Sequence, residues 1–290
     1  MGKITKGKAL MRNLCIALCL LCALAVLPGK AHSDPVGLTL VTQSFAPLQF
    51  AKDNEPAGYV ADFLLEALKR VNNDGRPVHV EAFEFLPWKR AMLMAETQPN
   101  TLFFSLSRTP EREDKFIWLG EVSPYGQYLY QLKRQPPIQT AGLKDLLKQD
   151  YRIGVQRGSS QHSYFQELGV RDASTLVHMT SYQQGIDMLY LGRIDLLPLT
   201  GFLSKGTVCA RGHDGTQLQP VVYIKELAKP LWAVFSKGTD PELVAAVQEE
   251  MKNLREEGFW EQRFNHHVGL WQEIACDAVA ITEPEMVSAD

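Results

Sequence analysis

Apolar and polar positions follow two different periods along the chain, and together they predict an α/β protein. Short apolar runs that are typical of strands occur at Gly37 to Gln43, His79 to Phe85 and Leu102 to Phe104. Between the first two, apolar residues at positions 60, 63, 64, 67, 68 and 71 form the stripe of a helix that packs on a sheet. Strands that alternate with amphipathic helices indicate layered α/β folds with largely parallel sheets.

The same alternation of predicted strands and helices resumes after Lys133-Arg134-Gln135-Pro136-Pro137, which has the composition of a linker. Beyond it, Tyr151 to Val155 is predicted as a strand, and Ser181 to Gly192 as a helix that opens with a capping box. A later helix is predicted from Pro241 to Gly258, because Thr239-Asp240-Pro241-Glu242 combines a capping box with Pro in the first turn. We therefore expect two α/β units.

The amino terminus has the layout of a secretory signal peptide. Four basic residues precede an apolar run from Leu14 to Pro28, and small residues follow it. We expect cleavage near Ala31 or Ser33, which removes residues 1–31. A retained signal anchor is the alternative, although the run is shorter than the about 20 apolar residues of a membrane span.

Charge and cysteine usage narrow the possible partners. Removal of residues 1–31 takes away five Lys and Arg residues and no acidic residue, so the formal charge falls from −3 to −8. This charge disfavours nucleic acid as a partner. Cys209 and Cys276 then remain, either as one disulfide, worth about 4 kcal/mol in the chain-entropy account, or as two free thiols. Beyond residue 31, no Cys-x-x-Cys or His-x-x-x-His spacing occurs, so a metal site is not expected, and no cofactor is expected either.

The segment from Ser105 to Arg112 carries the most informative polar chemistry. It joins Ser105 and Ser107 to two guanidinium groups, those of Arg108 and Arg112, at the predicted end of a strand. A guanidinium presents a planar fork of donors that matches a carboxylate, and adjacent hydroxyls can complete the coordination. The alternative is a surface loop in which both arginines pair with neighbouring acidic residues.

A second candidate anion site follows the strand predicted to end at Val155. There Gly158, Ser159 and Ser160 form a turn that opens a helix. Free backbone N–H groups and the positive end of the helix dipole favour an anion at such a turn. An ordinary turn with an N-cap serine is the alternative.

Five short motifs, in order along the chain, resemble the periplasmic solute-binding proteins that serve polar amino acid ABC transporters. They are Glu55 to Asp62, Ser107 to Arg112, Ile153 to Ser159, Leu191 to Asp195 and Lys252 to Trp260. The resemblance implies a type 2 periplasmic binding fold, in which two α/β lobes enclose a ligand cleft. Two segments join the lobes, near Leu132-Lys133 and Pro230-Leu231.

The resemblance also implies a domain organisation. We expect a discontinuous first lobe made of residues 36–132 and 231–270, a second lobe made of residues 133–230, and a carboxy-terminal tail from 271 to 290. The helix predicted from Pro241 then packs on the first lobe, because its apolar stripe of Val244, Val247, Met251 and Leu254 needs a sheet face.

Family members that bind amino acids clamp the ligand α-carboxylate with an arginine, and the resemblance places Arg112 at that position. It places Ser107 at a neighbouring hydroxyl contact, and Ser159 and Ser160 on the loop whose backbone amides meet the same carboxylate. Aromatic residues near the amino terminus are candidates for the cleft wall, or for the core of a lobe. The full set of candidate ligand-binding residues is Phe45, Trp88, Ser105, Ser107, Arg112, Gly158, Ser159, Ser160 and Thr200.

One position departs from the family pattern. Where amino acid binders carry the aspartate that holds the ligand ammonium, this chain has Thr200, which can accept a hydrogen bond but carries no charge. We therefore expect a carboxylate-bearing ligand and poor discrimination in favour of zwitterionic α-amino acids. Thr200→Asp is expected to improve amino acid binding.

The function that the resemblance implies is the capture of a small carboxylate-bearing solute in the periplasm and its delivery to an ABC permease in the inner membrane. The protein is then expected to be a monomer without enzymatic activity. Two alternatives stay open. One is a sensing or assembly role, in which the liganded protein docks on a receptor. The other is a dehydratase-like enzyme that uses Glu121 or Glu167 as general acid.

Overall fold

The computed structural model describes residues 35–74, 77–133, 135–170 and 174–273 of the 290-residue chain. The predicted signal peptide, its cleavage site and Cys276 lie outside these residues, as does the tail beyond residue 273. Within the described ranges, no helix is long and apolar enough to cross a membrane.

A five-stranded mixed sheet forms the first lobe, in the order β4-β1-β5-β12-β6. β1 lies parallel to β4 and β5, whereas β12 runs antiparallel to β5 and β6. The strands of this sheet are β1 (Val36–Thr42), β4 (Val78–Phe85), β5 (Thr101–Ser107), β6 (Phe116–Ser123) and β12 (Leu231–Ser236). A separate hairpin of β2 (Phe50–Lys52) and β3 (Glu55–Ala57) follows β1. Because β12 comes after the whole second lobe in sequence, this sheet is built from two separate stretches of chain.

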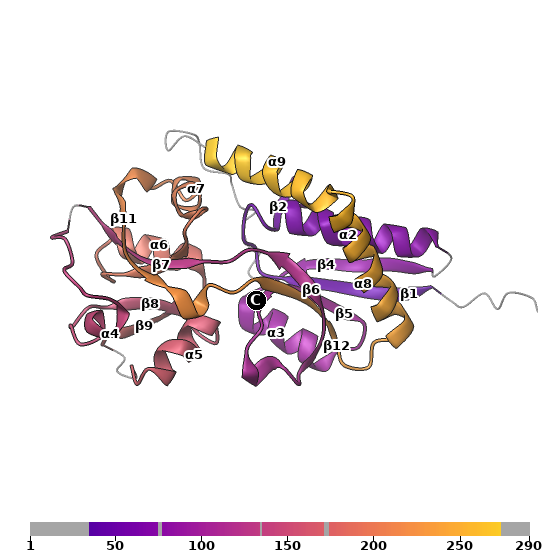
Figure 1. Ribbon diagram of the computed structural model, residues 1–290, viewed down its shortest axis with the longest axis horizontal. Helices are drawn as coiled ribbons and strands as arrows, with labels where there is room; N and C mark the ends of the chain where they lie inside the picture. Colours follow the sequence, from indigo (N-terminus) through magenta and orange to yellow (C-terminus); the bar gives the residue numbers. More distant parts are fainter. Residues whose placement is uncertain (1–34, 75–76, 134, 171–173, 274–290) are drawn as a thin grey trace, which may run out of the picture. The chain divides into compact units, whose positions relative to one another are not determined.

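Helices cover both faces of this sheet (Figure 1). α2 (Tyr59–Asn73), α8 (Pro241–Glu256) and α9 (Phe259–Glu273) share a core on one face, and α3 (Trp88–Thr97) packs on the other. Every residue of the stripe predicted between Val60 and Val71 is buried in α2. α2 begins after Gly58, where the φ is 110° and an added Cβ would lie 2.4 Å from the Leu48 carbonyl oxygen. Only glycine fits this entry into the helix.

α8 returns to the first lobe and packs against α2 and β6. Its buried residues are Leu243, Val244, Val247, Met251 and Leu254. They include all four positions of the predicted stripe, so the periodicity located the buried face. The helix is capped by Asp240, whose carboxylate accepts from the Glu242 amide at 2.9 Å. We expected the cap at Thr239, but its hydroxyl instead donates to the carbonyl of Ser236.

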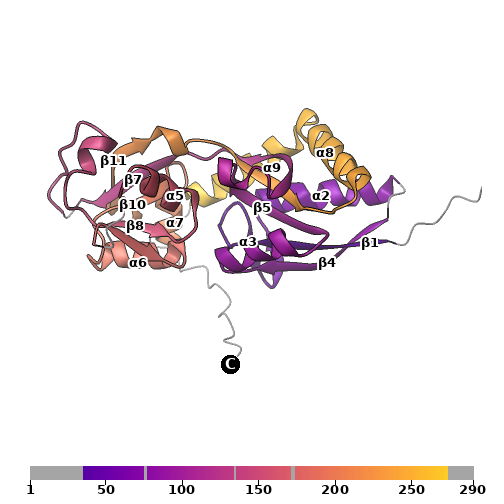
Figure 2. The same cartoon turned by 90° about the horizontal axis from the view of Figure 1, so that it is seen from below.

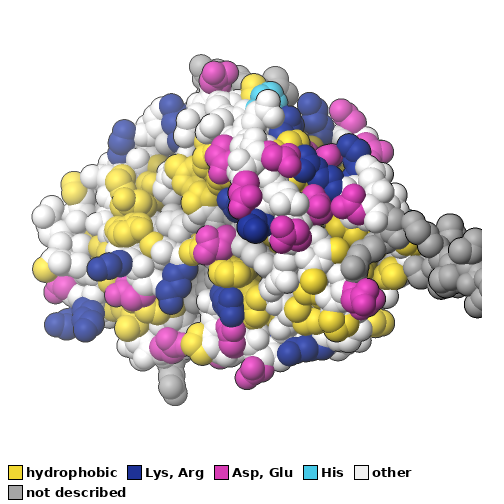
Figure 3. Space-filling model, turned by 45° about the vertical axis from the view of Figure 1, so that its right-hand side comes forward, with side chains coloured by type: hydrophobic (Ala, Val, Ile, Leu, Met, Phe, Trp, Pro, Cys, Tyr) yellow, Lys and Arg dark blue, Asp and Glu magenta, His cyan; other side chains and the backbone are white. Residues whose placement is uncertain are grey.

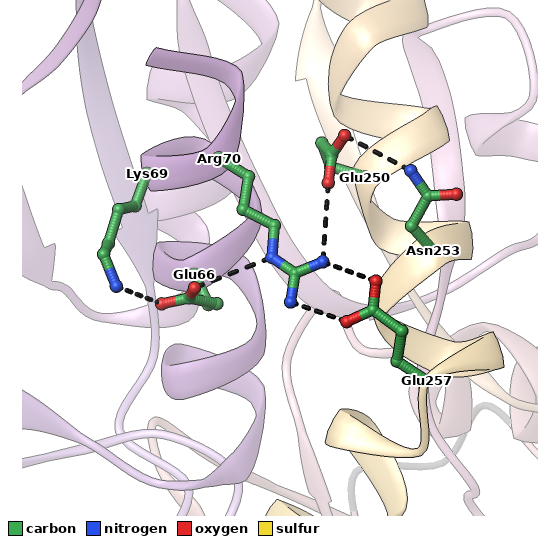
Figure 4. A network of polar contacts seen from close by, with 6 residues as sticks. All are labelled: Glu66, Lys69, Arg70, Glu250, Asn253 and Glu257. Atoms are coloured by element: carbon green, nitrogen blue, oxygen red, sulfur yellow. Dashed lines mark hydrogen bonds and ion pairs between the residues drawn. The ribbon is translucent and has the colours of Figure 1, made fainter. Parts of the chain in front are cut away.

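Several charged side chains on the outside of the helices form ion pairs. Figure 3 shows acidic and basic groups interspersed over one face of the protein. In one network, Arg70 of α2 donates to both carboxylate oxygens of Glu257 at 2.7 and 2.8 Å, and one of its nitrogens lies 3.8 Å from Glu250 of α8 (Figure 4). The network joins α2 to the carboxy-terminal end of α8, in addition to the shared apolar core.

The second lobe contains a three-stranded antiparallel sheet, β10-β7-β11, and a parallel pair, β8 and β9. The pair joins the sheet through a bridge between Ile153 and Leu196. The elements are β7 (Gln127–Leu132), α4 (Leu143–Leu146), β8 (Ile153–Gln156), α5 (Ser160–Glu167), β9 (Leu176–Met179), α6 (Tyr182–Tyr190), β10 (Leu197–Thr200), α7 (Ser204–Ala210) and β11 (Leu218–Ile224). Short 3-10 turns at Gly215–Gln217 and Lys225–Leu227 also belong to this lobe, and one at Pro110–Arg112 follows β5 in the first lobe.

The chain enters the second lobe earlier than the sequence indicated. We expected a crossing near Leu132-Lys133, but β7 pairs with β10 and β11, so the first crossing is the segment from Pro124 to Gly126. The linker-like composition after Leu132 marks a loop within the second lobe instead. The second crossing runs from Ala228 to Pro230, next to the expected position, and both crossings can be followed in Figure 1 and Figure 2.

Two further features bear on the carboxy-terminal region. α9 continues to Glu273 and Trp271 is buried in it, so the first three residues of the expected tail belong to a helix. Cys209, in α7, is disulfide-bonded. This excludes the free-thiol alternative for Cys209, while the other four cysteines of the sequence lie outside the described residues.

Candidate functional site

A cavity lies between the two lobes, where the carboxyl ends of β1 and β5 meet the beginning of α5. Its volume is about 40 Å³, and at about 10–15 Å³ for each water molecule it has room for about three. The residues that line it are Thr42, Gln43, Phe45, Gln49, Trp88, Ser105, Ser107, Arg112, Tyr125, Gln156, Ser159, Ser160, Gln161, Tyr182 and Leu231. The structure thus brings together seven of the nine predicted site residues, all except Gly158 and Thr200.

Ser105 occupies a β-bulge in β5, next to the cavity. The pairing between β5 and β12 skips it, and its φ of 63° lies in the left-handed region that serine rarely adopts. The bulge shifts the alternation of the strand, so that Phe103 and Leu106 pack on the same face. The Ser105 hydroxyl donates to the side-chain oxygen of Gln49 at 2.7 Å. Backbone strain at a cavity-lining residue is a common property of ligand sites.

Arg112 is the one charged side chain among the described residues that line the cavity, and it is 7% exposed. Its Nη1 donates to the Ser107 carbonyl at 2.9 Å and its Nη2 to the Gly158 carbonyl at 3.1 Å, so it reaches from the first lobe to the second. The guanidinium carbon lies 5.4 Å from the centre of the Trp88 ring. No described Asp or Glu forms an ion pair with Arg112, and burial lowers its pKa. It is a buried cation without an acidic partner.

Arg108, four residues earlier, has a different environment. Its Nε donates to the carboxylate of Glu113 at 2.8 Å, and its guanidinium lies 5.0 Å from the ring centre of Trp118 and 4.8 Å from that of Trp232. The surface-loop interpretation is therefore correct for Arg108. It is not correct for Arg112, because the acidic residues beside it in sequence do not pair with it.

The turn before α5 brings backbone groups of the second lobe to the cavity. The Gly158 carbonyl accepts from Trp88 Nε1 at 3.1 Å as well as from Arg112. Ser159 is the N-cap of α5, and the Ser160 hydroxyl lies 3.1 Å from the Ser107 hydroxyl of the first lobe. The amides of the first turn have no acceptor within the helix, and the dipole makes this end positive. Gly158 does not line the cavity, but its carbonyl accepts from two side chains that do.

A neutral polar cluster forms another part of the wall. The hydroxyls of Tyr125 and Tyr182 lie 3.2 Å apart, and Gln161 Nε2 donates to them at 3.0 and 2.5 Å. Burial raises the pKa of both tyrosines, so their hydroxyls stay protonated. Tyr182 also stacks on Phe45 of the first lobe, with ring centres 5.7 Å apart. The sequence analysis missed these residues, because none belongs to a recognisable motif and the crossing at Pro124 was not predicted.

Thr200 does not line the cavity. It ends β10 opposite Gln127 of β7, is 5% exposed, and hydrogen-bonds to Tyr125 through its hydroxyl. A carboxylate at position 200 would meet the Tyr125 hydroxyl and not the cavity. Gln161, which does line the cavity, is therefore a better position for introducing a charge.

The two candidate general acids also lie elsewhere. Glu121 lines a separate groove of about 620 Å³ beside the crossings, and Glu167 is exposed near the end of α5. In the described part of the chain, no three His, Cys, Asp or Glu side chains cluster so that they could hold a metal ion.

No curated protein sequence matches the chain, but solved structures do. An amino acid ABC transporter substrate-binding protein from Streptococcus pneumoniae, bound to L-arginine, is 18% identical, with a TM-score of 0.65 over 81% of this chain and 95% of that one. A histidine kinase sensor domain with similarity to periplasmic binding proteins is 20% identical, with a TM-score of 0.64 over 81% and 97%. An ancestral amino acid-binding protein, a precursor of cyclohexadienyl dehydratase, is 20% identical, with a TM-score of 0.62 over 80% and 95%. These matches confirm the predicted two-lobed fold.

The sequence pattern of the bacterial extracellular solute-binding proteins, family 3, matches residues 38–269. The match covers both lobes and confirms the resemblance that the five short motifs indicated. The chain belongs to the bacterial extracellular solute-binding proteins of family 3.

Proposed function

We propose that this protein captures a small carboxylate-bearing solute between its lobes, and that Arg112 binds the carboxylate. The observation that carries the proposal is the burial of Arg112 without an acidic partner among the described residues. A buried charge without compensation is costly, and an anionic ligand removes that cost. A guanidinium has five N–H donors, so the two bonds that Arg112 makes to carbonyls leave donors for a ligand.

The surroundings of Arg112 suit the same anion. The hydroxyls of Ser107 and Ser160 lie beside it, and the positive end of α5 faces the cavity. These groups come from both lobes, so a bound carboxylate would favour the closed arrangement. Domain closure on a ligand is the usual way in which two-lobed proteins retain it.

The cavity offers no charge for an ammonium group. None of the described side chains that line it is Asp or Glu. Burial of a zwitterionic α-amino acid would therefore leave its cation uncompensated. We expect the ligand to be a carboxylate without an ammonium group. This expectation rests on the residues that line the cavity and not on Thr200, which lies outside it.

The biological role that we propose is delivery of this solute from the periplasm to an ABC permease by a monomeric binding protein whose signal peptide has been removed. Family membership and the S. pneumoniae transporter protein support this role. A sensing role is the second candidate, since one structural relative is a histidine kinase sensor domain. Adjacent permease and ATPase genes would favour transport, and an adjacent kinase gene would favour sensing. Catalysis is less favoured, because neither Glu121 nor Glu167 lines the cavity.

The test is a thermal-shift screen against small carboxylic acids, followed by competition calorimetry with matched pairs of amino acids and deaminated acids. A ligand that binds the folded state raises the unfolding temperature. Arg112→Lys should weaken binding while the fold stays intact, because lysine keeps the charge and loses the fork. A preference of about tenfold, or 1.4 kcal/mol, for the amino acid of each pair would contradict the proposal for the ammonium group.

A further inference from the structure

We infer that Gln161 selects for a hydroxyl group on the ligand, so that the solute is a short hydroxycarboxylic acid. This inference rests on the proposed function for the carboxylate and adds the second recognition group. The observation behind it is one unpaired oxygen atom of the Gln161 side chain. Gln161 is 1% exposed and lines the cavity, yet its Oε1 is buried without a hydrogen-bond partner among the described residues.

The hydrogen bonds of Gln161 fix which end of the amide is free. Both hydrogens of Nε2 have an acceptor, one in the Tyr125 hydroxyl at 3.0 Å and one in the Tyr182 hydroxyl at 2.5 Å. A flipped amide would lose both of these bonds and would gain at most one, because each hydroxyl has a single hydrogen and one of the two hydroxyls already donates to the other. The orientation with Oε1 free is therefore the one that uses more of the hydrogen-bonding capacity of the amide.

A buried carbonyl oxygen without a hydrogen-bond donor destabilises the protein. A ligand that donates a hydrogen bond to it removes this penalty and binds more tightly. A hydroxyl is such a donor and is neutral. An ammonium group also donates, but none of the described side chains that line the cavity carries the negative charge it would need once buried. A simple alkyl acid would leave Oε1 unpaired. The cavity of about 40 Å³ favours a short chain.

Gln127 supplies a matched control. It is also fully buried, its Nε2 also donates to the Tyr125 hydroxyl, at 2.5 Å, and its Oε1 is also without a partner among the described residues. It differs in one respect, because it does not line the cavity. A change at Gln127 therefore disturbs the same cluster without removing an acceptor from the cavity wall.

The experiment uses three acids with one carbon skeleton, namely lactate, propanoate and alanine, which differ only in a hydroxyl, a hydrogen and an ammonium group. Calorimetry on the wild-type protein should show lactate binding about tenfold more tightly than propanoate, and alanine no more tightly than propanoate. Gln161→Met should abolish the preference for lactate, whereas Gln127→Met should keep it. Gln161→Glu should raise the affinity for alanine relative to lactate.

The outcomes separate this inference from the proposed function. Equal affinities of the wild-type protein for lactate and propanoate, with both lost in Arg112→Ala, would overturn the role of Gln161 and leave the carboxylate site standing. Binding of propanoate that is unchanged in Arg112→Ala would overturn the proposed function itself. The comparison of lactate with propanoate on the wild type needs no variant, so it decides the question even where Gln161→Met fails to fold.

Discussion

Buried charge is paired between the outer helices, but it has no described partner of opposite charge in the cavity. Between α2 and α9, Asp62 binds Arg263 at 2.6 Å and His267 at 2.9 Å, so a carboxylate that is half withdrawn from water has two donors. In the cavity, the more deeply buried Arg112 donates to two carbonyl groups and lies over an aromatic ring, and it forms no ion pair with a described acidic residue. Paired charges hold helices together within the protein, and a buried charge without a partner is available to a ligand.

The largest effect should come from a matched pair of substitutions at the two arginines of one loop. Arg112→Met should weaken binding of a carboxylate ligand by about 2–4 kcal/mol, because it removes a desolvated, charge-assisted contact. Arg108→Met should leave the affinity unchanged, since Arg108 already pairs with Glu113. Isothermal titration calorimetry measures both. Equal losses in the two variants would show that the loop acts through its overall charge and not through one site.

The next largest effect should come from disruption of the ion pairs that Asp62 forms between α2 and α9. Asp62→Asn should lower the free energy of unfolding by about 1–2 kcal/mol, because Arg263 and His267 lose the negative charge of their shared acceptor. Urea unfolding of the ligand-free protein checks this, and ligand affinity should not change. A loss of affinity without a loss of stability would contradict the assignment of Asp62 to the fold.

The same carboxylate predicts acid sensitivity. Burial alone would raise the pKa of Asp62, but hydrogen bonds from His267 and Arg263 outweigh it and hold the pKa below its ordinary value. Since the folded-state pKa is lowered, the stabilisation is complete above the unfolded value of about 3.9 and is lost as the pH falls through the folded value. Asp62→Asn should therefore flatten the stability profile below about pH 4.

A smaller effect, a few-fold change in ligand affinity with pH, is expected from two histidines beside the turn at Gly158. His162 and His178 lie with their Nε2 atoms 2.9 Å apart, and the Gly158 amide lies 3.4 Å from His162 Nδ1. Burial lowers the pKa of both histidines, assisted by the positive charges of Arg157 and Lys89. The two neutral histidines therefore stabilise the folded state fully above the unfolded pKa of about 6.5. This stabilisation is lost as the pH falls through their lowered folded-state pKa values.

Affinity should therefore decline as the pH falls below about 6.5, since protonation disturbs the turn that presents the Gly158 carbonyl to Arg112. Calorimetry over this range is the measurement. A variant in which His162 and His178 are both replaced by Gln is the control, and it should show a flat profile. A decline of equal size in that variant would assign the effect to the ligand.

The smallest effect is expected at the exposed network of Figure 4. Arg70→Gln should reduce stability less than Asp62→Asn does, because the charges of Arg70 and Glu257 are solvated when the pair is broken. The difference from the wild type should vanish in about 1 M salt, where the screening length is about 3 Å. Urea unfolding at low and high salt tests this. A difference that persists in high salt would indicate that Arg70 acts through packing.

The sequence by itself determined the elements whose residues signal locally. The stripes of α2 and α8 follow from spacing alone, since a period of 3.6 residues fixes which side chains share a helix face. Motif order gave the family and the two-lobed fold. The position of Arg112 as a candidate followed in the same way, because guanidinium chemistry is a property of the side chain.

Only the tertiary structure decided which polar groups are paired. Arg108 and Arg112 have the same side-chain chemistry, and only the family resemblance singled out Arg112 in the sequence. The bulge at Ser105 and the turn at Gly158 withdraw Arg112 from water and leave Arg108 at the surface with Glu113. The crossing before β7 depended on strand pairing, which no local pattern encodes. Tyr125 and Gln161 meet across 36 positions of sequence, so their cluster, and the free oxygen it leaves in the cavity, exist only in the folded chain.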